Sequence, residues 1–414
     1  MIRLNPVTSG PSAALNHPQK ILGGRGFLIL IALLSAFVPL STDLYLPALP
    51  GMARYFHATV DVTNLTLILF FVFYSAGTLI WGPLSDKYGR KPVLLTGLTL
   101  YIAASLCCAV AWGIYPLIVF RALQALGGSA AGAVATALVK DVYEGRQREK
   151  VLALVQSMAL LAPAVAPVLG AFLLRVTSWR GVFWTLTGIG FLSLIGCLLL
   201  DETHRQLYRG NILQALGRLG TVLKNPGFAS LLILFSVANL SLMAFIASSS
   251  YIYENHFGLS AQGYSYFFAL NAVGLILGPL LYLQLSKRFR RPAGRARFII
   301  AAFTVLAVSG GAICGWGGQS PWLFAATLWP ATIAGSCVRP PGTNLMLQQQ
   351  QEDTGSAASL MICFGLLMGS VGMTIISLKW RDTIFALGIL NVVVGLLCGI
   401  LWLYLSGQPF VKQD

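Results

Sequence analysis

Charged side chains are rare inside the long apolar stretches of this sequence, and two of them, Asp43 and Arg121, are the first candidates for chemistry. An ionised carboxylate in apolar surroundings is costly unless it is paired, hydrated or protonated. Asp43 could therefore take up and release a proton. The plainer alternative is a helix-end acid that caps a kink made by Pro39 and Pro47. The other acidic residues fall at the ends of apolar stretches or between them.

Arg121 is the matching cation. Polar and small residues follow it at helical spacing, namely Gln124, Gly128, Gly132 and Thr136. A guanidinium stays charged and needs an acceptor. Arg121 could bias Asp43 toward its ionised form, or it could bond backbone carbonyls and only order the helices around it.

The composition identifies the elements that must position these residues. Of 414 residues, 56% are hydrophobic and 10% are charged, against about 25% charged in a soluble domain, so an ordinary soluble enzyme is excluded. A helix that crosses a bilayer needs about 20 mostly apolar residues. Twelve stretches meet this requirement: 26–48, 61–83, 92–111, 114–139, 150–174, 179–200, 227–250, 262–285, 297–316, 321–343, 355–378 and 383–406.

The net charge of +15 comes from Lys and Arg residues whose distribution among the loops predicts the orientation of the chain in the membrane. Most of the 28 Lys and Arg residues lie in alternate loops, and loops rich in Lys and Arg face the cytoplasm. We therefore expect a multi-pass protein of a bacterial inner membrane with both termini cytoplasmic, and no nucleic-acid partner. Arg121 and Arg339 are the two cations inside predicted spans.

The chain is predicted to divide into two six-helix halves. The segment 82–92 (GPLSDKYGRKP) between spans two and three has a weaker counterpart at 285–292 (LSKRFRRP) between spans eight and nine. The predicted organisation is a leader 1–25, a bundle 26–200, a connector 201–226, a bundle 227–406 and a tail 407–414. The connector has apolar residues at helical spacing, which indicates either an amphipathic helix on the cytoplasmic face or a plain tether.

Four segments carry a resemblance to a known family. Segment 82–92 resembles the signature of the major facilitator superfamily, and 121–128 (RALQALGG) resembles that superfamily's arginine-bearing drug-transporter motif. Segment 162–171 (APAVAPVLGA) is similar to its antiporter motif, although Ala162 and Ala171 stand where Gly is usual. Segment 41–50 (STDLYLPALP) is similar to the bicyclomycin/chloramphenicol-resistance branch.

The resemblance implies an all-α membrane protein with twelve transmembrane helices in two parallel six-helix repeats. It implies a proton-coupled secondary transporter that exports small drug-like molecules, such as phenicols or other antibiotics, by alternating access. Asp43 and Arg121 would couple protons, and the protein would act as a monomer in the bilayer. The alternatives are a metabolite uptake symporter or facilitator of the same fold and a non-transporting membrane sensor.

The loop motif and the proline-rich segment are the candidate gating elements. Gly82 is expected to allow close helix packing and Gly89 a tight reversal, while Asp86 can contact Arg90 or a helix N-terminus. Pro163, Pro167 and Gly170 are expected to let their span bend. The plainer alternatives are a positively charged anchor for the loop and relief of helix packing for the prolines.

Candidate substrate contacts are the aromatic and amide side chains that could face a cavity: Tyr45, Tyr74, Gln124, Asn239, Phe245, Phe268 and Asn271. No cofactor is predicted. The seven cysteines form no Cys-x-x-Cys pair and no histidine cluster stands near them, so no metal site and no disulfide framework are expected. No nucleotide-binding or catalytic motif appears, which argues against an enzyme.

Overall fold

The structure, a computed structural model, describes residues 19–203, 212–288, 292–350 and 354–411. The two ends of the described chain lie at the same end of the molecule. The backbone N–H of Lys20 donates to Oδ2 of Asp201 at 2.8 Å, and the carbonyl of Phe410 lies against Gly227. Asp86 also lies at this end, which is called the Asp86 end below; the opposite end is called the Asp61 end.

The helices before the connector are α1 (Gly23–Ser35), α2 (Phe37–Asp43), η1 (Leu46–Ala48), α3 (Leu49–Tyr55), α4 (Val60–Tyr88), α5 (Arg90–Ala109), α6 (Ile114–Val142), α7 (Gly145–Val176) and α8 (Trp179–Leu198). The first predicted span is bent by 42° where α1 gives way to α2. Pro39 causes this break, because its ring has no N–H and clashes with the carbonyl four residues earlier. The predicted kink at Pro39 is therefore present.

The remaining helices are α9 (Ile212–Leu223), α10 (Pro226–Val237), α11 (Asn239–Tyr251), η2 (Ile252–His256), α12 (Ala261–Ser286), α13 (Pro292–Trp316), α14 (Pro321–Cys337), α15 (Arg339–Gln348), α16 (Thr354–Ser377) and α17 (Thr383–Leu405). Two predicted spans are interrupted here, at Ala238 and at Val338. Pro340 and Pro341 follow the second break, and neither has an N–H to continue the helix before it.

The connector contains helix α9, which contacts α4, α10 and α16. Val222 of α9 is fully buried, and Leu219 and Leu223 pack against the apolar core. The amphipathic helix expected in the connector is present over these residues, whereas Leu207 lies outside the described part of the chain.

Nine helices of the described chain are long and apolar enough to cross a membrane. The bent segment made of Gly23–Ser35 and Phe37–Tyr55 gives a tenth span. The other two predicted spans correspond to shorter apolar helices, Leu161–Val176 within α7 and the 17-residue α14. Each predicted span therefore has a helical counterpart, and the predicted all-α architecture is confirmed.

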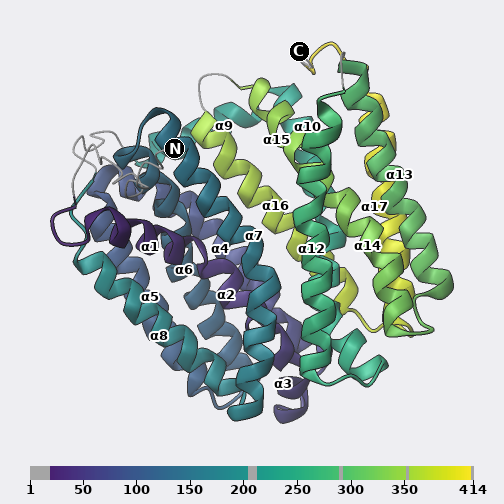
Figure 1. Ribbon diagram of the computed structural model, residues 1–414, viewed down its shortest axis with the longest axis horizontal. Coiled ribbons are helices and arrows are strands. Elements are labelled where there is room, and N and C mark those ends of the chain that lie inside the picture. Colours follow the sequence, from purple (N-terminus) through teal and green to yellow (C-terminus); the bar gives the residue numbers. More distant parts are fainter. Residues whose placement is uncertain (1–18, 204–211, 289–291, 351–353, 412–414) are drawn as a thin grey trace, which may run out of the picture.

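Helices from the two groups meet at the Asp61 end and spread apart toward the Asp86 end (Figure 1). The pairs in contact are α4 with α16, α7 with α12, and α3 with α11. Asn64 ties them together, since its Nδ2 donates to Oγ of Ser377 at 2.8 Å and to the carbonyl of Ala247 at 3.2 Å. One amide of α4 therefore holds both α11 and α16.

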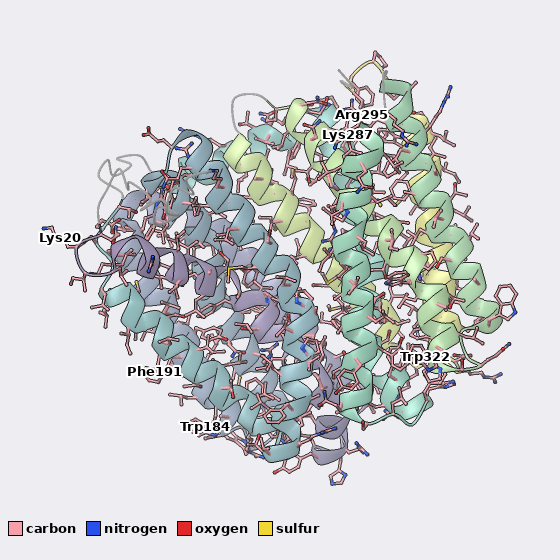
Figure 2. The ribbon with its side chains drawn as sticks, viewed as in Figure 1. Lys20, Trp184, Phe191, Lys287, Arg295 and Trp322 are labelled. Carbon is pink, nitrogen blue, oxygen red and sulfur yellow. The ribbon has the colours of Figure 1, made fainter. Side chains whose placement is uncertain are left out.

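Large apolar side chains remain exposed on the outer surface. Trp184, Phe191 and Trp322 are 53%, 47% and 70% exposed, and Figure 2 shows them along the flanks, while the labelled cations lie toward the Asp86 end. An apolar surface of this extent is stable against lipid rather than water.

Candidate functional site

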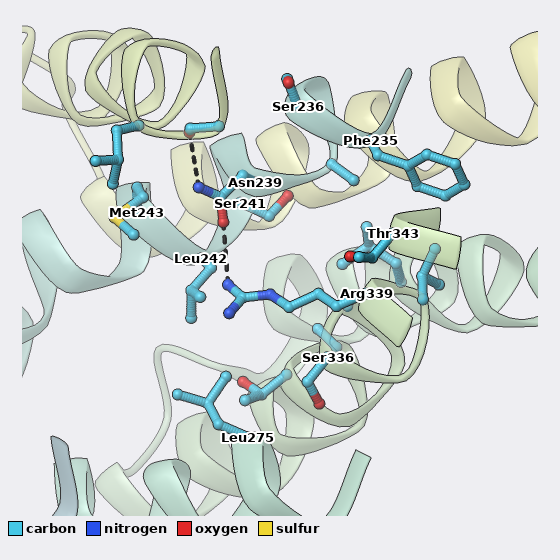
Figure 3. A pocket seen from close by; sticks show the side chains of 18 of the residues that line it. Phe235, Ser236, Asn239, Ser241, Leu242, Met243, Leu275, Ser336, Arg339 and Thr343 are labelled. Atoms are coloured by element: carbon cyan, nitrogen blue, oxygen red, sulfur yellow. Dashed lines mark hydrogen bonds between the residues drawn. The ribbon is translucent and has the colours of Figure 1, made fainter. Parts of the chain in front are cut away.

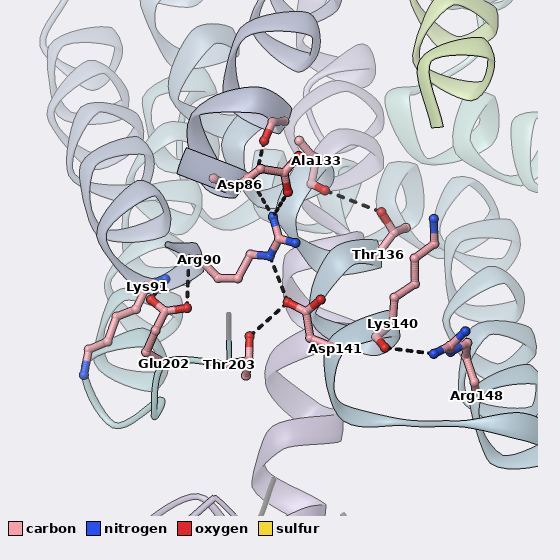
Figure 4. A network of polar contacts seen from close by, with 12 residues as sticks. Asp86, Arg90, Lys91, Ala133, Thr136, Lys140, Asp141, Arg148, Glu202 and Thr203 are labelled. Carbon is pink, nitrogen blue, oxygen red and sulfur yellow. Dashed lines mark hydrogen bonds and ion pairs between the residues drawn. The ribbon is translucent and has the colours of Figure 1, made fainter. Parts of the chain in front are cut away.

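A polar network centred on Arg90 joins the helices at the Asp86 end (Figure 4). Nη1 of Arg90 lies 2.5 Å from Oδ1 of Asp86 and donates to Oγ of Ser85 at 2.7 Å, and Nε donates to Oδ2 of Asp141 at 2.9 Å. Thr203 also donates to Asp141, at 3.2 Å. The predicted Asp86–Arg90 contact is confirmed. Its partners belong to α4, α5, α6 and the segment after α8, so the network braces one half of the molecule.

Glu202 completes the network at the start of α5. Its carboxylate accepts the backbone N–H groups of Arg90 at 2.9 Å and Lys91 at 3.0 Å, where a negative charge is stabilised by unpaired N–H groups and the helix dipole. Gly89 has φ of 98°, and a Cβ there would lie 2.7 Å from Oε2 of Glu202. The tight reversal predicted at Gly89 is present, and the approach of Glu202 is a second requirement for glycine.

The reason given above for Gly82 is wrong. A Cβ on Gly82 would meet nothing within 4 Å, so this glycine does not bring two helices together.

Arg121 is fully buried in α6. Its Nη1 donates to the carbonyl of Ser41 at 3.0 Å and to Oε1 of Gln124 at 2.7 Å. Its guanidinium carbon lies 4.3 Å from the ring centroid of Phe70 and 4.8 Å from that of Tyr45, within the range of cation–π attraction. Nε and Nη2 have no hydrogen-bond partner among the described residues.

Asp43 ends helix α2 and is 6% exposed. Its Oδ1 accepts a hydrogen bond from Oγ1 of Thr42 at 3.0 Å. Within the described chain Asp43 forms no ion pair. Arg121 therefore reaches the same helix through the carbonyl of Ser41, two residues from Asp43, and the structure does not join the carboxylate and the guanidinium directly.

The proline-rich segment of α7 lies against this region. Pro163 and Pro167 are inside helix α7, which continues to Val176; that they let this span bend stays a prediction. Gly170 faces the backbone carbonyl of Leu44 so closely that a Cβ would overlap it. The glycine of this motif therefore lets α7 approach the residue that follows Asp43.

An open pocket of about 400 Å³ lies among helices α10 to α17 (Figure 3). Apolar side chains form most of its wall, among them Phe235, Leu242, Met243, Met346 and Met361. Arg339 extends across it, and Nη2 of Arg339 donates to Oδ1 of Asn239 at 3.1 Å. Both helix breaks of this half, Ala238 and Val338, line the pocket.

Of the seven predicted substrate contacts, Asn239 is the one that lines this pocket. The other six are buried in packing or hydrogen bonds. Tyr45 bonds Thr66, Gln124 bonds Ser105, and Asn271 accepts from Thr332. Phe245 stacks on Phe268 with ring centroids 5.8 Å apart, and the hydroxyl of Tyr74 lies against Gly132.

Sequence reasoning missed the roles of three charged residues. Arg339 was noted as a cation within a span, but the pocket beside it is lined by several helices, which the spacing within one helix does not report. Asp141 and Glu202 are among the acids at the ends of apolar stretches or between them, and their contacts with Arg90 bridge 51 and 112 positions of the chain. Among the described residues no group of His, Cys, Asp or Glu has the geometry of a metal site.

Two groups of apolar helices with a pocket near mid-helix are typical of secondary transporters. The family model described as the Major Facilitator Superfamily matches residues 31–373. The chain belongs to this superfamily, and it is a multi-pass membrane transporter rather than an enzyme.

Two curated relatives cover most of the chain. The uncharacterized MFS-type transporter YdgK of Bacillus subtilis (strain 168) is 28% identical over 83% of this chain and 86% of its own length. A chloramphenicol resistance protein of Pseudomonas aeruginosa is 30% identical over 89% of this chain and 90% of its own. The predicted resemblance to the resistance branch is confirmed.

Solved structures support the fold. A crystal structure of the peptide transporter POT in complex with alafosfalin superposes with a TM-score of 0.73 and 16% identity, covering 95% of this chain and 98% of that one. At this identity the likeness concerns the fold alone.

Proposed function

We propose that this protein exports small drug-like molecules, phenicols among them, across the bacterial inner membrane in exchange for protons. The observation that carries the proton coupling is the buried carboxyl of Asp43, which lies inside a span without an ion-pair partner in the described chain. The name of the Pseudomonas aeruginosa relative supports a phenicol as cargo. Relatives named as resistance proteins favour export over uptake, because export of a drug lowers its concentration in the cell.

In this proposal Asp43 binds a proton that enters from outside. Arg121 acts on Asp43 through α2, because its hydrogen bond to the carbonyl of Ser41 fixes the turn that carries the carboxyl. Gly170 brings α7 against Leu44, so movement of α7 changes the surroundings of Asp43. Each elementary charge that crosses 100 mV supplies about 2.3 kcal/mol.

The two halves, 26–200 and 227–406, move as bodies in the transport cycle. The Arg90 network holds α4, α5 and α6 together at the Asp86 end, which we place in the cytoplasm with both termini. The side chain of Asp86 is 53% exposed, so it is available to the other half when this end closes. The proposed cycle therefore alternates closure between the Asp61 end and the Asp86 end.

The test is transport in proteoliposomes. Asp43→Asn keeps the size of the side chain and removes its titration. We expect an imposed pH gradient to drive chloramphenicol accumulation by the unmodified protein, and Asp43→Asn to abolish that accumulation while gradient-independent chloramphenicol exchange continues. Asp61→Asn, at the start of α4, is the matched control and should retain coupling. Full gradient-driven accumulation by Asp43→Asn would show that Asp43 is not the coupling acid.

A further inference from the structure

Arg339 is the sole charged residue that lines the pocket in the described part of the chain. Its side chain is exposed, and this exposed surface faces the pocket that it lines. No acidic residue of the described chain forms an ion pair with it. A cation held in an apolar pocket without a counter-charge is costly unless water or an anion completes its surroundings.

The position of Arg339 is fixed by its neighbours. Nδ2 of Asn239 donates to the carbonyl of Gly365 at 2.8 Å, which leaves Oδ1 of Asn239 turned toward Arg339, and Arg339 donates to it at 3.1 Å. Pro340 and Pro341 begin α15 directly after Arg339. Asn239 is therefore a positioning residue that aims the guanidinium across the pocket (Figure 3).

The pocket holds further polar atoms without partners. Oγ of Ser241 and both amide atoms of Asn391 are buried and have no hydrogen-bond partner among the described residues, and both residues line the pocket. Ser241 is 7% exposed and Asn391 is 1% exposed. Buried polar groups in folded proteins are almost always hydrogen-bonded, so the wall of the pocket has unused hydrogen-bonding capacity just beneath its surface.

The rest of the wall is mostly apolar. Leu242, Met243, Met346 and Met361 line the same pocket as Arg339 and give it an apolar and adaptable surface. A guanidinium presents five N–H donors and matches a carboxylate in two parallel hydrogen bonds. We propose that this pocket recognises amphipathic organic monoanions, with their carboxylate on Arg339 and their apolar body on the methionine-rich wall.

This inference rests on the proposed function, because it names the class of cargo that the pocket prefers. The two proposals can be tested separately, because binding of an anion to the pocket needs no pH gradient. A carboxylate-bearing analogue of a neutral cargo should bind more tightly than the neutral compound itself.

The first experiment measures the charge preference of the pocket in uncharged detergent. Met243→Cys places a thiol on the wall, and the full-length protein without this change gives the background of the native cysteines. An anionic thiosulfonate (sulfonatoethyl) and a cationic one (trimethylammonioethyl) are compared by labelling rate. We expect Arg339→Gln to lower the anionic-to-cationic rate ratio about tenfold, Arg339→Lys to keep most of it, and the exposed control Lys287→Gln to leave it unchanged.

The second experiment measures protection of the same thiol by chloramphenicol and by its hemisuccinate ester, which carries one carboxylate. The ester should protect at about tenfold lower concentration than the parent compound, and Arg339→Gln should remove this difference. Equal protection by the two compounds, protection by neither, or an unchanged labelling ratio in Arg339→Gln would overturn the proposal. Failure of the proposed function would appear instead as absent gradient-driven flux with these labelling results intact.

Discussion

The surroundings of two arginines inside predicted spans differ. Arg121 lies in the first half of the chain and Arg339 in the second. Arg121 is fully buried, with aromatic rings at its guanidinium and one hydrogen bond to a neighbouring backbone. Arg339 crosses an open pocket and has one side-chain partner, Asn239. A charge within the membrane therefore does not identify a binding site by itself. The free volume beside the charge distinguishes a site from a packed cation.

The helices that carry the two arginines explain the difference. Helix α6 runs unbroken from Ile114 to Val142, and Gly97 and Gly127 let α5 and α6 pack backbone to backbone. The corresponding helix of the second half is interrupted at Val338, before Pro340 and Pro341. Irregular backbone is tolerated within a membrane where it is buried in protein or lines a cavity, and here it lines the pocket.

The largest expected difference in the free energy of unfolding is between variants that lack Arg121 and variants that lack Arg339. Arg121→Met leaves the carbonyl of Ser41 and Oε1 of Gln124 without their donor and should lower the free energy of unfolding by about 3 kcal/mol. Arg339→Met faces open space and should change it by less than about 1 kcal/mol. Unfolding in mixed micelles of increasing denaturing-detergent content measures both. Equal losses would remove the contrast between a packed and an open cation.

Two glycine substitutions test the packing around the arginines with a smaller expected effect. A Cβ on Gly127 would lie 2.5 Å from the backbone nitrogen of Tyr101 and 2.7 Å from the carbonyl oxygen of Gly97. Gly127→Ala should therefore force α5 and α6 apart at a cost of about 2 kcal/mol. Gly335 lines the pocket, and a Cβ there meets nothing within 4 Å, so Gly335→Ala should stay within about 0.5 kcal/mol. Thermal melts of the purified variants decide between these outcomes.

The smallest expected effect has the opposite sign. Asn391 is buried with both amide atoms unpartnered in the described chain, so Asn391→Leu should raise the stability of the ligand-free protein by up to about 1 kcal/mol. Asn64→Leu is the matched control, because it removes two hydrogen bonds and should lower stability. A destabilised Asn391→Leu variant would mean that this amide is satisfied without a ligand.

The sequence was sufficient for the architecture and for part of the site. Apolar length and alternating charge predicted the helical spans, because the bilayer requires about 20 apolar residues for each. The loop motif also predicted the contact of Asp86 with Arg90, because a tight reversal at Gly89 brings the end of α4 back against the start of α5. Asp43 and Arg121 stood out because charges are rare inside such stretches.

The pocket could not be predicted in the same way. The break at Val338 has a signal in Pro340 and Pro341, but the break at Ala238 has no proline to mark it. The partners of Arg90 in α6 and after α8 come from tertiary packing, which periodicity within one helix does not report. Arg339 therefore appeared as one more cation, although its surroundings make it the stronger candidate for recognition.

The amide of Asn64 sets a bound on how firmly the Asp61 end is held shut. Its two hydrogen bonds contribute about 1 kcal/mol each to stability, which corresponds to a population bias of roughly 30-fold. Under the proposed cycle, these two hydrogen bonds alone would leave the outward-open form populated at a few per cent. The packing of α4 on α16 and of α7 on α12 adds to this bias, so cargo binding must offset more than the hydrogen bonds of Asn64 before the Asp61 end opens.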